Sequence, residues 1–121
     1  MFLMMTLWRP VERVVSEVRV KANLRLLATS AGGRETPISG RFGSYRPNHN
    51  FFGPDNREML MGLVWLSPDD VLAPGESTVV EVQFLNWSSL KPELHPGREW
   101  LIQEGSHVVG LGAVIEVLAE P

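Results

Sequence analysis

The stretch EVRVKANLRLL (Glu17–Leu27) decides the fold class of this sequence. Apolar and polar residues alternate along it, which is the period of a strand with one buried face and one face in water. The same alternation recurs in TVVEVQFL (Thr78–Leu85), and shorter strand-like runs follow in REWLIQE and VVGLGAVIEVL. No segment keeps the apolar spacing of three and four residues that is typical of a helix. We therefore predict an all-β fold, a small antiparallel β-barrel of about six strands, with a sandwich as the alternative architecture.

The inward positions of these runs predict the core, which we expect to contain Val20, Leu24, Val80, Val82, Phe84, Ile102 and Val114. The run EMLMGLVWL (residues 58–66) differs, because it is apolar on both faces. Leu60, Val64 and Leu66 fall on one face, and Met59, Met61, Leu63 and Trp65 fall on the other. A strand of this kind is covered on both sides, either by its own chain or by a partner. Gly110 and Gly112 in the last strand are interpreted as marks of a bend or of close backbone approach.

Length and composition indicate one soluble domain. The chain has 121 residues, of which 44% are hydrophobic and none is cysteine. We expect a lead-in over residues 1–15 and a barrel domain over residues 16–121. The absence of cysteine excludes disulfides and Cys-ligated metal sites and favours a reducing, cytoplasmic location. The opening MFLMMTLWRP lacks the pattern of a signal peptide, and no apolar run reaches the length of a membrane span.

Charge is unevenly distributed along the chain. The net charge is −3, yet residues 1–57 hold nine basic and four acidic side chains, and the remainder holds two basic and ten acidic ones. Such a chain can present a basic face to phosphates or to an acidic partner. The alternative is that the barrel mixes the two halves and leaves no patch.

Motifs that would indicate an enzyme are missing from the sequence. The three histidines, His49, His95 and His107, stand in separate segments without metal-ligand spacing. There is no GxxxxGK[ST] loop and no nucleophile elbow. We therefore expect no catalytic residue, no cofactor, no metal and no binding of GTP by this chain.

Four tryptophans raise the question of an exposed anchor. Trp65 and Trp100 lie on predicted strands and are interpreted as core residues, whereas Trp87 lies in a predicted loop. Trp87 is therefore the candidate for an aromatic anchor that contacts a partner protein.

The least ordinary segment is GGRETPISGRFGSYRP (Gly32–Pro47), which holds four glycines, two prolines and three arginines. Its GGRETP and YRP motifs, followed later by IQEGSHVVGLGAVIEVL, resemble the C-terminal (third) domain of elongation factor Tu. The resemblance runs from about Val18 to Leu118, with three motifs in the same order and at comparable spacing. It implies a small antiparallel β-barrel, and in that family the domain contacts the T-stem of aminoacyl-tRNA, the GTPase domain and the exchange factor.

The resemblance also implies site residues. Arg34 matches the family arginine that reaches tRNA phosphate, Glu104 and Gly105 match a pair at the tRNA surface, and Asn48 stands where the family has glutamine. Glu35 replaces a family histidine, which places an anion beside the expected phosphate. Glu35, Arg46 and Trp87 are further candidates for partner contact. An alternative for Arg34 and Arg46 is that each serves the fold, with Arg46 paired inside it.

We accordingly expect a binding module without catalytic activity. One hypothesis is that it binds tRNA or another RNA, or a protein of the translation machinery. The alternative is a protein–protein interaction domain that uses the barrel surface and has no role with RNA.

Overall fold

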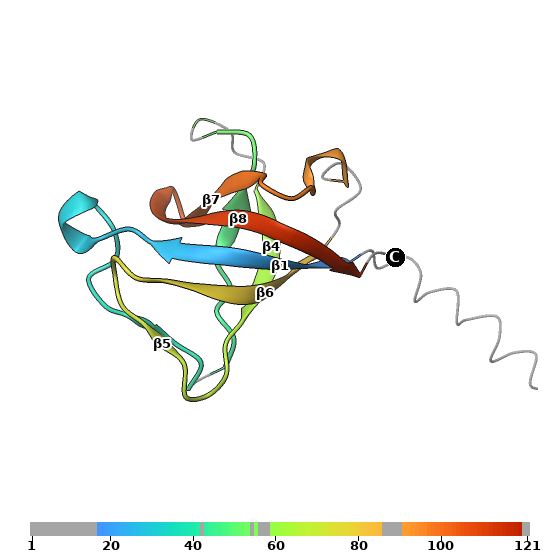
Figure 1. The fold of residues 1–121 in the computed structure, drawn as a ribbon. Helices are drawn as coiled ribbons and strands as arrows, with labels where there is room; N and C mark the ends of the chain where they lie inside the picture. Colours follow the sequence, from blue (N-terminus) through green and yellow to red (C-terminus); the bar gives the residue numbers. More distant parts are fainter. Residues whose placement is uncertain (1–16, 42, 54, 56–58, 86–90, 120–121) are drawn as a thin grey trace, which may run out of the picture.

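The structure, a computed structural model, describes residues 17–41, 43–53, 55, 59–85 and 91–119. The predicted lead-in over residues 1–15 and the candidate anchor Trp87 lie outside these residues. Six strands form the main sheet, namely β1 (Glu17–Leu26), β3 (Asn48–Asn50), β4 (Leu60–Trp65), β6 (Ser77–Leu85), β7 (Glu99–Glu104) and β8 (His107–Ala119). They form a closed antiparallel barrel in the order β1-β6-β4-β3-β7-β8, with β8 returning to β1 (Figure 1). The predicted all-β barrel of about six strands is confirmed.

Alternation along the strands places the core as predicted. All seven residues expected inside the barrel are buried, and none is more than 7% exposed. Pairing of β1 with β6 sets Val20 opposite Val82, so two inward side chains meet at the same level of the barrel. Val64 of β4 and Leu66, which follows the strand, are buried while Trp65 is 48% exposed, so the interpretation of Trp65 as a core residue is wrong. Trp100 on β7 is buried, as expected.

Two short strands were not predicted. β2 (Ile38–Ser39) and β5 (Val71–Leu72) pair with each other and form a separate two-stranded ribbon. Both lie in segments that the sequence marks as loops, because glycine and proline flank them. The other irregular elements are two single 3-10 turns, η2 (Thr29–Ala31) and η3 (Lys91–Glu93), and the described residues contain no α-helix.

Close backbone approach explains the two glycines of β8. A Cβ atom added to Gly112 would lie 2.4 Å from the indole of Trp100, and one added to Gly110 would lie 2.8 Å from the carbonyl oxygen of Arg25. Both distances are shorter than an ordinary contact, so only glycine fits at either position without a shift of its neighbours.

Candidate functional site

The glycine-rich stretch begins with a turn that aims Arg34 at the barrel. Gly32 ends the 3-10 turn η2 in the left-handed region, with φ of +91°, and its N–H donates to the carbonyl oxygen of Thr29. At Gly33 an added Cβ would lie 2.2 Å from the carbonyl oxygen of Leu27. The pair of glycines therefore lets the chain fold back tightly against the end of β1, and Arg34 follows directly.

Arg34 is held by contacts within its own chain. Its Nη1 forms an ion pair with Oε2 of Glu104, at the end of β7. Its Nε donates to the carbonyl oxygen of Thr36 at 3.0 Å, and Nη2 donates to the Thr36 hydroxyl at 3.1 Å. The guanidinium also lies 5.8 Å from the ring centroid of Tyr45. The positive charge is thus compensated, and most of its donors have partners.

Tyr45 completes this cluster of Arg34, Tyr45 and Glu104, which we call the Arg34 cluster. The Tyr45 hydroxyl donates to Oε2 of Glu104 at 2.5 Å, and its backbone forms two hydrogen bonds with Val64 of β4. Burial raises the pKa of Tyr45 well above its ordinary value, and the hydrogen bond to the Glu104 carboxylate raises it further. Tyr45 therefore stays a neutral donor, and the cluster fastens the glycine-rich stretch to the barrel.

The structure brings together only part of the site that the resemblance implies. Arg34 contacts Glu104, and Gly105 follows in the exposed turn between β7 and β8. Asn48 lies on β3, opposite Gln103 of β7. Glu35 is exposed.

Arg46 behaves differently from the interpretation that it pairs inside the fold. Its side chain is exposed and lines a groove on the surface. Internal contacts are made instead by Arg34, in agreement with the alternative that this arginine serves the fold.

The outer face of β4 carries an apolar stripe, which sequence alternation predicted to be covered. Met61, Leu63 and Trp65 form this β4 stripe. Met61 is 66% exposed, Trp65 is 48% exposed, and Leu63 is half-buried. The indole N–H of Trp65 donates to the side-chain oxygen of Gln83 at 3.2 Å, which fixes the ring against β6. No described residue covers the stripe.

A small groove of about 60 Å³ adjoins the stripe. The register of the strands explains which residues line the groove. Met61 pairs with Asn48 of β3 on one side. On the other side Gly62 pairs with Phe84 of β6, so the next position of the register places Met61 beside Leu85. The lining of the groove is mostly apolar, with Arg46 as the one charged side chain, and comprises Arg46, Pro47, Asn48, Met61, Gly62, Leu63 and Leu85. The β4 stripe and this groove share Met61 and Leu63 and form one continuous surface. The sequence predicted the apolar outer face of this strand, but it did not predict the groove beside it.

Sequence reasoning missed a buried histidine. His49 on β3 is fully buried among Phe84 and Trp100, and the Trp100 indole N–H donates to its Nδ1 at 3.0 Å. The proton of the neutral ring is therefore on Nε2, which makes no hydrogen bond with a described residue. Burial lowers the pKa of His49 to about 4, and the neighbouring Gly62 backbone opposes this shift in part. The ring is a core group and does not reach the surface.

The arrangement does not provide clustered ligands for a metal within the described part of the chain, where no three His, Asp or Glu side chains gather. Among the same residues, no helix combines the length and the apolar character that a membrane crossing requires.

A scan against protein-family models finds no match for this chain.

Proposed function

We propose that this chain is a non-catalytic binding module that docks a protein partner on the β4 stripe and the adjoining groove. The observation that carries the proposal is the exposure of Met61 and Trp65 on the same face of one strand, with Leu63 between them. Tryptophan and methionine are enriched at protein interfaces, and tryptophan is among the residues that most often dominate the binding energy.

The surroundings of the stripe support a protein ligand over a nucleic acid. Its neighbours on β6 are Gln83 and Glu81, and Glu81 already forms an ion pair with Arg19. Arg46 is the cationic group at the groove, which suits a rim contact around an apolar centre. The resemblance to elongation factor Tu suggests that the partner belongs to the translation machinery.

The test is affinity capture from lysate of the source cells with three forms of the chain. The wild type is compared with Met61→Glu/Trp65→Glu, and with Ile115→Glu as a matched control. Ile115 is also an exposed apolar residue, but it lies on β8, three strands from β4 in either direction around the barrel. Far-UV circular dichroism confirms that all three fold.

We expect the wild type and the control to retain the same protein at 0.5 M salt (about the ionic strength at which surface charge pairs are screened), because apolar burial resists salt. The double variant should recover at least about tenfold less of it. Equal recovery by all three forms would remove the β4 stripe from the function.

Binding of tRNA is the second candidate function, favoured by the positions of Arg34, Glu104 and Gly105 at one end of the barrel. Binding of tRNA would require Arg34 to release the Glu104 carboxylate and to contact a phosphate in its place, so that one anionic partner replaces another. In that case affinity for labelled tRNA falls steeply with salt, and Arg34→Ala lowers both the affinity and the salt slope. Absence of binding at low salt, measured by fluorescence anisotropy, eliminates this candidate.

A further inference from the structure

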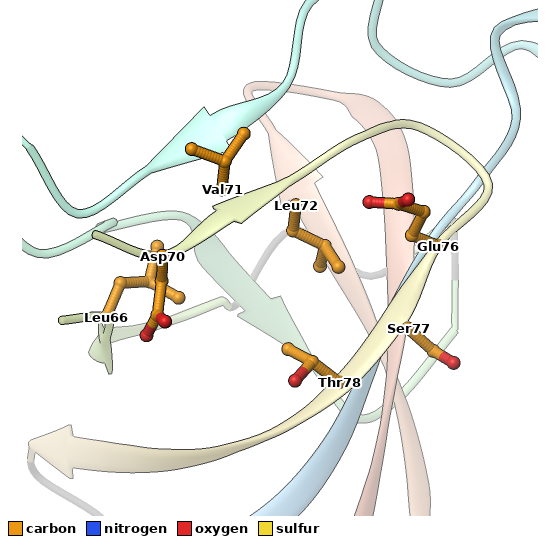
Figure 2. A pocket seen from close by; sticks show the side chains of 7 residues that line it. All are labelled: Leu66, Asp70, Val71, Leu72, Glu76, Ser77 and Thr78. Carbon is orange, nitrogen blue, oxygen red and sulfur yellow. The ribbon is translucent and has the colours of Figure 1, made fainter. Parts of the chain in front are cut away.

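A cleft of about 320 Å³ lies between β5 and β6, on a part of the surface that the proposed function does not use (Figure 2). The chain leaves the barrel after β4 at Leu66, forms β5, and returns as β6. As a result β4 pairs with β6 only from Gly62 to Trp65, whereas β1 pairs with β6 from Ser77 onward. The first residues of β6 therefore have a strand neighbour on one side only.

Ladder geometry shows which backbone groups face the cleft. The Leu26 N–H donates to the Glu76 carbonyl oxygen, so even-numbered residues of β6 direct their backbone groups toward β1. Odd-numbered residues then face the β4 side, in agreement with Val64 of β4, which bonds to Tyr45 on the opposite side. Backbone N–H and C=O groups of Ser77, which lines the cleft, and of Val79, the next odd-numbered residue along β6, consequently point to this side of the strand, where no described strand pairs with them.

The opposite wall of the cleft is a second strand edge. The Gly40 N–H donates to the Asp70 carbonyl oxygen, so Asp70 and Leu72 direct their backbone groups toward β2. Val71, which is exposed, therefore directs its backbone groups away from β2. Leu66 and Leu72 form an apolar floor between the two edges, since both are buried. An extended chain in this position finds strand hydrogen bonds and an apolar contact together.

Charge selects the kind of segment that fits. The lining residues include Asp70 and Glu76 and no basic side chain, and the Glu76 carboxylate projects into the space between β5 and β6 (Figure 2). One oxygen of each carboxylate accepts a local backbone N–H, from Ser67 for Asp70 and from Ala73 for Glu76. These bonds fix the carboxylates beside the cleft while leaving each with its negative charge.

We propose that the cleft binds an extended segment of a partner protein that adds as a strand to the free edge of β6 and carries lysine or arginine beside an apolar residue. The apolar side chain packs on Leu66 and Leu72, and the cations face Asp70 and Glu76. Main-chain hydrogen bonds to Ser77 and Val79 supply affinity, and the charges select the sequence. This inference does not rest on the β4 stripe, because it uses different side chains and the backbone of a different strand.

The test uses the peptide Lys-Val-Lys-Val-Lys-amide, labelled with fluorescein at its N-terminus, with the whole chain. Fluorescence anisotropy should show saturable binding, and amide signals of Ser77 and Val79 should shift in two-dimensional NMR and exchange more slowly with solvent. N-methylation of the two peptide valines removes strand donors without changing charge, and it should weaken binding about tenfold. A peptide with glutamate in place of lysine should not bind.

Protein variants test the same contacts from the other side. Asp70→Asn/Glu76→Gln keeps the acceptors for the Ser67 and Ala73 amides and removes both charges, so it should weaken the lysine peptide about tenfold at low salt. The matched control, Glu99→Gln/Glu116→Gln, makes the same change in net charge at two exposed positions on β7 and β8 and should bind as the wild type.

Three results would overturn the proposal. The first is no change in anisotropy at about 1 mM protein, where even weak peptide binding is visible. The second is equal binding of the N-methylated or the acidic peptide. The third is self-association of the chain in sedimentation that Val79→Pro abolishes, which would assign the β6 edge to a second copy of the chain.

Discussion

His49 is a titratable ring inside an apolar cluster, and its burial couples the stability of the barrel to pH. The pKa is about 4 in the folded chain and 6.5 for an ordinary histidine, so the unfolded chain binds the proton more readily. The stabilising contribution of the neutral ring is present above pH 6.5 and is lost as pH falls toward 4. We expect a loss of about 2–3 kcal/mol in the free energy of unfolding across that window, measured by urea denaturation.

The His49→Asn variant isolates this contribution, because asparagine keeps an acceptor for the Trp100 indole and has no charge to gain. Its free energy of unfolding should be lower than that of the wild type at pH 7, and the difference should shrink as pH falls to 4. A constant difference at all pH values would contradict a depressed pKa for His49.

Arg34 and Glu104 lie 70 positions apart, and their ion pair predicts a measurable coupling. Arg34→Met should lower the free energy of unfolding by about 1–2 kcal/mol, because it leaves Glu104 without its charged partner. In a double-mutant cycle with Glu104→Gln, the two changes should be non-additive by about 1 kcal/mol, a value reduced by the partial exposure of the pair. Additive effects would mean that Arg34 is free for an external ligand.

At the scale of the elements, β8 packs against the Trp100 indole of β7 at Gly112, where there is no room for a side chain. Gly112→Ala should destabilise the barrel by about 1–3 kcal/mol, because the added methyl group overlaps the indole ring. Trp100→Phe removes the indole atoms nearest to Gly112, so the cost of Gly112→Ala should be smaller in that background. Thermal unfolding of the four proteins checks this, and an unchanged cost would exclude the steric explanation.

Elements with clear alternation could be predicted from the sequence, and short ones could not. The pattern of β1 and β6 fixed both their position and their inward residues, because burial of one face forces a period of two. β2 and β5 have two residues each, and their pairing depends on how the chain returns to the barrel after β4. Trp65 was assigned to the core because tryptophan is a large apolar residue. The alternation along β4 indicates the outer face for it, because the preceding residue, Val64, points inward.

The candidate sites show the same division. Sequence patterns predicted the apolar outer face of β4, which is a local property of one strand. They did not predict that Arg34 and Glu104 compensate each other, or that β6 has a free edge, because both depend on residues brought together by the fold. The His49–Trp100 hydrogen bond was missed for the same reason.

At the scale of the whole molecule, the barrel is closed by β8, which pairs with β1 on one side and β7 on the other. Removal of residues 107–121 therefore leaves both β1 and β7 with unpaired edges and exposes the core. We expect the shortened chain to lose the cooperative urea transition and to bind hydrophobic dyes. A sharp transition at an unchanged midpoint would show that five strands suffice.

This closure has a consequence for synthesis on the ribosome. Leu26 of β1 pairs with Gly110 of β8. Strand β1 is synthesised early, and it cannot complete its pairing until β8 has been synthesised. At ordinary translation speeds the wait is roughly 4 to 17 seconds, during which the apolar side of β1 lacks its final neighbour. Folding of this domain is therefore completed only after β8 has left the exit tunnel, and chaperones that recognise extended apolar segments have that interval in which to bind.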